Sequence, residues 1–302
     1  MQLARNGKVG LRDLGFVLVH LIPLIALFTH VTPFDWVVCG FLYFFRMFFV
    51  TAGYHRYFSH RTFKTSRVFQ FLLAFFAQTT LQKGALWWAY ARREHHRYSD
   101  SWDDPHSRLR YGFWYSHIGW ILDPQFRATR YDKVHDFAKF RELVWLNTYY
   151  SVPWAIMGLA VWLIGDVVNG GALGNFWPGL STFCIGFCLS TVLVMHGTFT
   201  INSLMHLIGG QRYETGDESR NSFILTLVTL GDGWHNNHHY YPNTARIGFF
   251  WWEFDPAYYV LKILSWLGIV WDLRTVPDHI KHSRNMKEAQ RLAQQAKHPV
   301  TP

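Results

Sequence analysis

The chain contains 302 residues, of which 50% are apolar and 19% aromatic, and its formal net charge is +9. This combination is high for a soluble globular protein and favours a membrane protein. Anionic lipid headgroups account for the positive charge. Because no basic-aromatic pattern of a nucleic-acid reader is evident, we expect membrane lipid as a partner and no nucleic acid.

Four apolar stretches are candidates for membrane-spanning helices, which need roughly 17–25 residues. They cover about 14–31, 34–51, 146–168 and 176–200. Their short connections predict two helical hairpins. The first stretch follows Arg5, Lys8 and Arg12 without a small-residue cleavage pattern, so we expect a retained anchor rather than a signal peptide.

The distribution of basic residues predicts the orientation. Residues 30–35 contain no Lys or Arg, and residues 165–176 contain a single charged residue, Asp166. By the positive-inside rule, both termini and both large polar regions are expected on the cytoplasmic side of a multi-pass protein.

The remaining segments predict a helical cap on that side. The apolar run within residues 63–90 is too short to span a membrane. Residues 247–271 mix aromatic and charged residues, as an interfacial segment does. Strand patterns are too weak to predict a sheet. We therefore expect one all-α membrane domain over 1–302, with a cytosolic cap from about 52–145 and 202–277 and a polar tail at 278–302. The cysteines at 39, 184 and 188 lie in apolar spans, so a disulfide framework is not expected.

Histidines gather just beyond the predicted cytoplasmic ends of the apolar helices. Eight of the 17 histidines occur in four separate places on this one side of the membrane. They are His55, His60, His95, His96, His206, His235, His238 and His239. Isolated histidines such as His20, His30 and His196 are expected to be hydrogen-bonded packing residues, and those at 117, 135, 279, 282 and 298 have no ligand spacing.

The spacing of the eight histidines predicts two metal ions. On an ideal helix His235, His238 and His239 fall within an arc of about 100°, and Asn202 and His206 lie about 40° apart. His55 and His60 lie about 140° apart, which suits two neighbouring ions or a helix that ends between them. A zinc site takes three or four ligands, whereas two adjacent iron ions use this number of imidazoles. We infer a histidine-bound dimetal centre at the membrane surface.

From about residue 34 to 255 the chain resembles the membrane fatty-acyl desaturases of the stearoyl-CoA desaturase type, especially their bacterial members. The shared stretches are "GYHRYFSHRTFK", "HHRYSD", "DPHS", "SHIGW", "NSLMH" and "GWHNNHHYYP". The resemblance implies a stalk of four spanning helices under a cytosolic cap that holds a di-iron centre. It also implies that Asn202 holds a metal-bound water.

The activity implied by the resemblance is removal of two hydrogens from a long-chain acyl thioester to form a cis double bond, using dioxygen, two iron ions and two electrons. Acyl-CoA and a delta-9-like position are the expected substrate and product type. The chain has no Gly-rich nucleotide loop, flavin fingerprint or haem motif, so the electrons are expected from a ferredoxin or a cytochrome b5-like protein with its reductase. No motif reports the substrate-binding residues, although Trp87, Trp88 and Tyr90 are candidates for an aromatic acyl tunnel.

One position departs from the family pattern. The second histidine box of the family reads H-x-x-H-H, and its first histidine is Arg92 here. Arginine has no lone pair to donate, and Glu94 lies roughly 200° around the helix from that position. A loop that brings in Asp103, Asp104 or His106 is one way to replace the ligand.

Two alternatives to a desaturase stay open at this point. The first is a membrane di-iron hydroxylase of a lipid or alkane. The second is a desaturase-fold protein whose catalysis is impaired because a cation replaces one ligand and repels a divalent ion.

Overall fold

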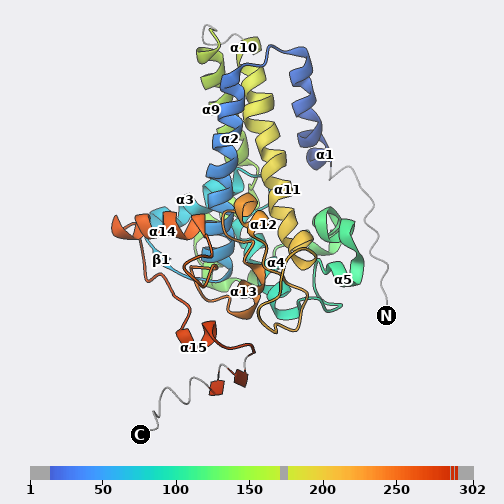
Figure 1. The fold of residues 1–302 in the computed structure, drawn as a ribbon. Coiled ribbons are helices and arrows are strands. Elements are labelled where there is room, and N and C mark those ends of the chain that lie inside the picture. The colour runs from blue at the N-terminus through green and yellow to red at the C-terminus, as the bar shows by residue number, and fades with distance from the viewer. Residues whose placement is uncertain (1–13, 171–175, 286, 289, 292–302) are drawn as a thin grey trace.

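The computed structural model describes residues 14–170, 176–285, 287, 288, 290 and 291, and it consists of a helical stalk above a broader helical cap (Figure 1). The predicted basic N-terminal residues, Arg5, Lys8 and Arg12, lie outside the described residues, as does the last part of the polar tail. Apart from a two-residue antiparallel ladder, the described regular structure is helical. The prediction of a mainly helical fold is therefore confirmed for the described residues.

The stalk is built from four helical segments that correspond to the four predicted apolar stretches. The first consists of α1 (Leu14–Leu21) and η2 (Ile22–Phe28), and the second of α2 (Pro33–Phe48) and η3 (Phe49–Ser59). The third is α9 (Val152–Val168). The fourth comprises α10 (Phe176–Ser181), η7 (Thr182–Leu189), α11 (Ser190–Asn202) and η8 (Leu204–His206). In the packed stalk, η7 contacts η2, α2 and α9.

By length and composition, two of these segments are able to cross a membrane, Pro33–Ser59 and Trp177–His206. The third qualifies only when α8 (Arg141–Thr148) and α9 are counted as one span, and they meet at 71°. The break precedes Pro153, which lies in the first turn of α9, as expected because proline is tolerated in the first turn of a helix but breaks a helix interior. The first segment has 15 residues, and at about 1.5 Å per α-helical and about 2.0 Å per 3₁₀ residue it extends roughly 26 Å. Four complete spans therefore stay a prediction.

The cap consists of short helices and loops. Its helices are α3 (Arg67–Gln78), α4 (Ala85–Tyr98), α5 (Arg108–Tyr111), η4 (Tyr115–Gly119), α6 (Trp120–Leu122), η5 (Pro124–Phe126), η6 (Tyr131–Lys133), α7 (His135–Ala138), α8, α12 (Phe223–Thr229), α13 (His235–Tyr240), α14 (Pro256–Trp266) and α15 (Asp278–Lys281). The unexpected ladder joins β1 (Lys64–Thr65) to β2 (Val270–Trp271) and ties the start of the cap to its end. The three cysteines are free and buried, as expected.

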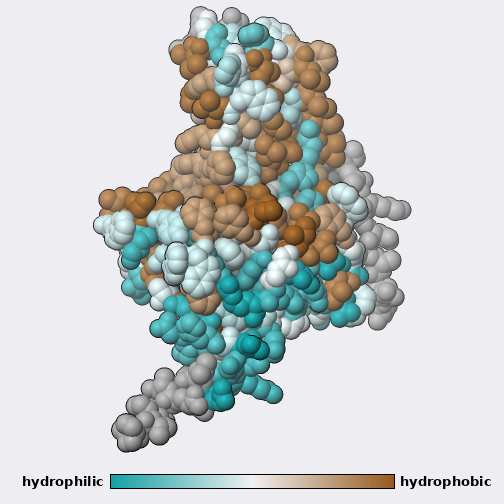
Figure 2. All heavy atoms as spheres, viewed as in Figure 1, coloured by the Kyte–Doolittle hydropathy of each residue, from teal (hydrophilic) through white to brown (hydrophobic). Residues whose placement is uncertain are grey.

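The surface changes character along the long axis of the molecule. Figure 2 shows an apolar stalk, an apolar band where stalk and cap meet, and a polar lower cap. Exposed aromatic residues of the predicted interfacial segment contribute to the apolar surface, among them Trp251 at 81% and Trp266 at 73% exposure. Such a band fits the interface of a membrane, where tryptophan is enriched.

Candidate metal centre

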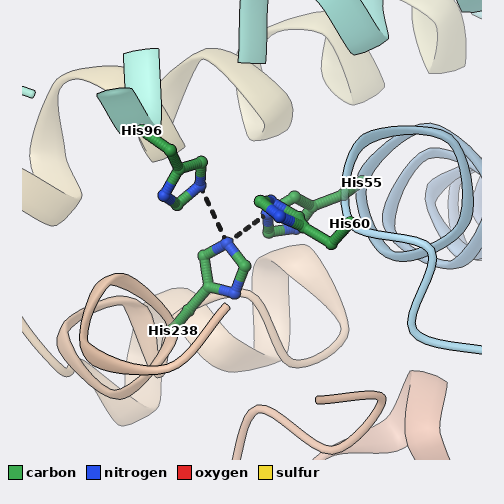
Figure 3. Close-up of side chains that lie close together, drawn as sticks. All are labelled: His55, His60, His96 and His238. Atoms are coloured by element: carbon green, nitrogen blue, oxygen red, sulfur yellow. Dashed lines mark hydrogen bonds between the residues drawn. The ribbon is translucent and has the colours of Figure 1, made fainter. Parts of the chain in front are cut away.

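All eight predicted histidines converge where the stalk meets the cap, and they form two groups. The first, called quartet A here, is drawn in Figure 3. Its members are His55, His60, His96 and His238. The second, quartet B, consists of His95, His206, His235 and His239. Within each group, one ring nitrogen from every histidine lies within 4.8 Å of the corresponding nitrogens of the others.

In quartet A, the Nε2 atom of His238 lies 2.8 Å from Nε2 of His55 and 3.0 Å from Nε2 of His96 (Figure 3). The ring of His60 completes the group, with its centroid 4.5 Å from that of His96. Its Nε2 is buried and has no hydrogen-bond partner among the described residues.

The winding of the second stalk helix explains why His55 and His60 belong to one quartet. Residues Phe49–Ser59 form a π-helix, whose hydrogen bonds link residues five apart rather than four. Residues at i and i+5 therefore face the same side, and the two imidazole centroids lie 5.1 Å apart. The ideal-helix separation of about 140° was wrong here, whereas the alternative of a helix that ends between the two residues is confirmed.

Quartet B draws on three elements of the structure. His95 Nε2 lies 3.4 Å from Nε2 of His239, and the ring of His235 lies 4.4 Å from that of His239, one helical turn away on α13. The continuous helix expected from Asn202 to His206 is wrong, because α11 ends at Asn202 and His206 lies on the 3₁₀ turn η8.

Neighbouring histidines in the sequence serve different quartets. His95 belongs to quartet B and His96 to quartet A. In the second pair, His238 belongs to quartet A and His239 to quartet B. The two quartets adjoin, since the rings of His96 and His239 lie 4.5 Å apart. The H-H pairs thus place two sets of ligands side by side.

Four aspartates support the histidines from behind, and of these the sequence had singled out only Asp104, as a possible metal ligand. Each accepts a hydrogen bond from one Nδ1 atom: Asp232 from His55 at 2.9 Å, Asp104 from His95 at 3.0 Å, Asp100 from His206 at 3.2 Å and Asp217 from His239 at 2.6 Å. A carboxylate in this position holds the proton on Nδ1, so the lone pair of Nε2 faces the centre of the quartet.

The donor set fits two divalent metal ions. Two nitrogens held at about 2.1 Å from one ion lie about 3.0 Å apart at a right angle and about 3.4 Å apart at the tetrahedral angle. The observed Nε2 separations of 2.8–3.4 Å lie within about 0.2 Å of this range. Burial lowers the pKa of His60, His96 and His238 well below the usual value, and neighbouring cationic groups lower it further. These three imidazoles are therefore neutral at pH 7, the form that binds metals.

Arg92 is a buried cation beside these ligands. Its side chain is 3% exposed, and its Nη2 lies 3.5 Å from Nε2 of His235. Nε and Nη1 have no hydrogen-bond partner among the described residues. Burial lowers the pKa of Arg92 to about 10, so the guanidinium is charged at pH 7.

The residues considered as replacements for a ligand at position 92 lie in different surroundings, and none of them belongs to a quartet. Asp103 is exposed, and Asp104 supports His95. His106 lies close to His95 and Asp104, and its ring packs 4.2 Å from that of His95. It belongs to neither quartet. Glu94 lies 3.5 Å from the ammonium group of Lys133.

Three histidines outside the quartets hydrogen-bond to one another. His20 Nε2 lies 3.1 Å from Nε2 of His196, whose Nδ1 lies 3.0 Å from Nε2 of His117. These contacts agree with the packing role expected for His20 and His196.

A cavity of about 590 Å³ lies between the first stalk segment, α4 and α11. Arg92, His106 and Asn202 line its wall near the quartets, and Phe16 and Met195 line it within the stalk. Trp87 and Trp88 also contribute to the wall, as predicted, whereas Tyr90 does not. The volume and apolar lining are those of a small-molecule site.

A helical stalk, eight histidines in two adjoining groups and an apolar cavity beside them define a membrane-type protein with a candidate dimetal centre. Sequence comparison assigns the class more closely. The profile of the fatty acid desaturase family matches residues 33–282, and the chain belongs to this family. It is therefore an oxidoreductase of lipid metabolism by family.

Known relatives act on acyl groups with different carriers. An acyl-CoA 5-desaturase of Anemone leveillei is 33% identical over 89% of this chain and 79% of its own length. An sn-2 palmitoyl-lipid 9-desaturase of Nostoc sp. is 33% identical over 78% of this chain and 81% of its own length. A hex-5-enoyl-[acyl-carrier protein] acetylenase of Moorena producens is 30% identical over 94% of this chain and 91% of its own length.

Proposed function

We propose that the protein is an oxygen-dependent desaturase that inserts a cis double bond into a long-chain acyl thioester, with acyl-CoA as the substrate and a delta-9-like position. The carrying observation is that Arg92 and His106, which line an apolar cavity of about 590 Å³, lie next to His235 and His95 of quartet B, which in turn adjoins quartet A. The quartets would hold two iron ions, and these would supply the oxidising chemistry. Members of the desaturase family generally use such a di-iron centre. One reaction consumes dioxygen, two electrons and two protons, removes two hydrogens from the chain and releases two waters.

The protein's own residues bind and orient the reactants. The eight imidazoles hold the ions, and the four aspartates fix their tautomers. The cavity orients the acyl chain and excludes water, which protects the reacting carbons from side reactions. Asn202 is 8% exposed and lines the cavity. We assign it the role of holding a water beside quartet B.

The remaining parts of the proposal concern partners and location. Electrons come from a separate protein, a ferredoxin or a cytochrome b5-like carrier with its reductase. The stalk spans the membrane four times, and the cap, the candidate metal centre and both termini lie on the cytoplasmic side. Support comes from the apolar surface of the stalk in Figure 2 and from the basic residues of the cap.

Expression in a host that makes saturated chains and lacks this desaturation tests the function. Gas chromatography with mass spectrometry is expected to show a new fatty acid lighter by two hydrogens. A variant with both His95→Ala and His96→Ala removes one imidazole from each quartet and is expected to give no product. His135→Ala, at an exposed position of the cap, is the matched control and should retain activity.

The same measurement separates the alternative reaction. A product heavier by one oxygen atom would identify a hydroxylase of the same centre. No modified lipid from the wild type, with a reductase and donor supplied, would contradict the proposed activity.

A further inference from the structure

Arg92 is the one feature of the candidate metal centre that the proposed desaturase function does not explain. Its guanidinium lines the cavity, and two of its three nitrogens have no hydrogen-bond partner among the described residues. A buried cation without a counter-ion is costly, because desolvation is not repaid by a partner. Of the described aspartates, Asp232, Asp104 and Asp217 act on it electrostatically, but each already accepts a hydrogen bond from a quartet histidine.

The charges around the centre leave Arg92 uncompensated. Two divalent ions bring four positive charges, and the four supporting aspartates bring four negative charges. Arg56 does not disturb this balance, since the charge of Asp255, whose Oδ1 lies 2.9 Å from Nη2 of Arg56, compensates it, although the same Nη2 also lies 3.5 Å from Oδ1 of Asp232. Among the described groups, the loaded site therefore keeps the single positive charge of Arg92.

The number of ligands also leaves room for an anion. Each quartet supplies four imidazoles, which bring no charge of their own when they bind a metal, and the resemblance places a ninth histidine where Arg92 stands. An oxygen donor from solution is able to contact an ion at that place and accept hydrogen bonds from the guanidinium. Carboxylate-type anions suit both partners, because guanidinium groups bind them with charge-assisted hydrogen bonds and divalent iron accepts oxygen ligands.

We propose that Arg92 and the dimetal centre together bind one carboxylate-type monoanion, such as formate or bicarbonate, which replaces the missing histidine as a ligand. The proposal rests on metal binding by the quartets, and deepens the proposed function by making the anion a condition for full loading. Arg92 acts electrostatically on histidines of both quartets, among them His60 and His235. Among the described residues, quartet A has a single supporting aspartate, so its ion is the one that depends most on the additional ligand.

Metal titration tests this without reference to catalysis. The full chain in detergent micelles is stripped with a chelator and titrated anaerobically with ferrous iron against a chromophoric chelator. One series contains formate and the other perchlorate at equal ionic strength. At a formate concentration roughly nine times its dissociation constant, the affinity for the second ion is expected to rise about tenfold.

Substitutions at position 92 provide the decisive comparison. Arg92→Gln is expected to lose the formate effect, and Arg92→His should bind the second ion tightly in both series. Arg97→Gln changes an exposed arginine on the same helix and should behave as the wild type. Equal wild-type affinity in perchlorate, formate and decanoate would overturn the proposal, and so would an unchanged anion effect in Arg92→Gln. If Arg92→Gln does not fold, the wild type and Arg92→His decide the outcome.

A third series with decanoate identifies the source of the carboxylate. A small free anion predicts that formate suffices, whereas a carboxylate at the head of a chain lying in the cavity predicts an effect of decanoate alone. No effect of either would overturn the proposal. Because iron binding is measured directly, a protein that fails to desaturate still gives a clear result here.

Discussion

Quartets A and B use the same side chain but differ in how their ligands are held. In quartet B, three of the four imidazoles donate to a buried aspartate, namely His95, His206 and His239. In quartet A, His55 donates to Asp232, whereas Nδ1 of His238 has no hydrogen-bond partner among the described residues. A carboxylate behind an imidazole fixes its orientation and raises its basicity as a ligand.

This difference suggests that the two quartets bind their ions with different affinities. Quartet B is prearranged and is expected to bind its ion first and more tightly. Quartet A depends on fewer supporting bonds and on the π-helix that aligns His55 with His60. Its ion is therefore the one whose occupancy should respond to mutation, anions and chelators.

Removing one imidazole from either quartet should have the largest effect. His238→Ala takes a ligand from quartet A, and His239→Ala takes its neighbour from quartet B. Iron content is expected to fall from about two ions per chain to about one in each variant, and unsaturated product should disappear from both. Elemental analysis with fatty acid profiling checks this. Two ions retained in either variant would show that the partition into quartets is wrong.

Removing one supporting carboxylate should have a smaller effect that differs between the quartets. Loss of such a partner typically costs about 10- to 100-fold in metal affinity. Asp232→Asn leaves quartet A without an aspartate, whereas Asp217→Asn leaves two in quartet B. We therefore expect the larger loss of affinity in Asp232→Asn, measured by chelator competition.

A stability control accompanies the aspartate comparison, because Asp232 also accepts a hydrogen bond from Thr51 at 2.5 Å. Thermal unfolding of the metal-free proteins separates a general loss of stability from a loss of affinity. Equal affinity losses in two folded variants would remove the asymmetry between the quartets.

The stalk was predictable from sequence because hydropathy and length are local properties. The four apolar stretches coincide with the four stalk segments, although individual ends differ by up to eight residues. The winding of each segment was not predictable, since a π-helix at Phe49–Ser59 and a 3₁₀ turn at Ile22–Phe28 depend on packing as well as on local preference. The bend between α8 and α9 has a local signal in Pro153 that hydropathy alone does not report.

The candidate site was predictable in membership but not in arrangement. Clustered histidines identified all eight residues, yet their division into quartets depends on helix winding and on contacts between distant segments. The supporting aspartates show the same limit. Asp104 is nine residues from its histidine, whereas Asp100 is 106 and Asp232 is 177 residues from theirs. No spacing rule reaches across such distances, although each aspartate lies near a histidine motif.

Substitution of Asn202 tests whether its side chain holds a water between the cavity and quartet B. Asn202→Leu removes the carboxamide from the cavity wall while keeping a side chain of similar size. Loss of one hydrogen-bonding group is worth about 0.5–1.5 kcal/mol, so activity should fall about 2- to 13-fold. Iron content should stay at two ions. A loss of one ion would instead make Asn202 part of the metal-binding set.

His106 provides the finest test, because it lies close enough to His95 and Asp104 to form a third group of potential ligands. Its ring packs against Trp120, with centroids 4.7 Å apart, and it lines the cavity. His106→Phe keeps an aromatic ring there and removes both nitrogens. If four imidazoles serve each ion, iron content and affinity stay unchanged, and activity shifts by no more than about threefold, as for an aromatic substitution that conserves most of the volume. Loss of one ion would mean that His106 turns toward the centre when metal is bound. One ion would then have five imidazole ligands and the other four.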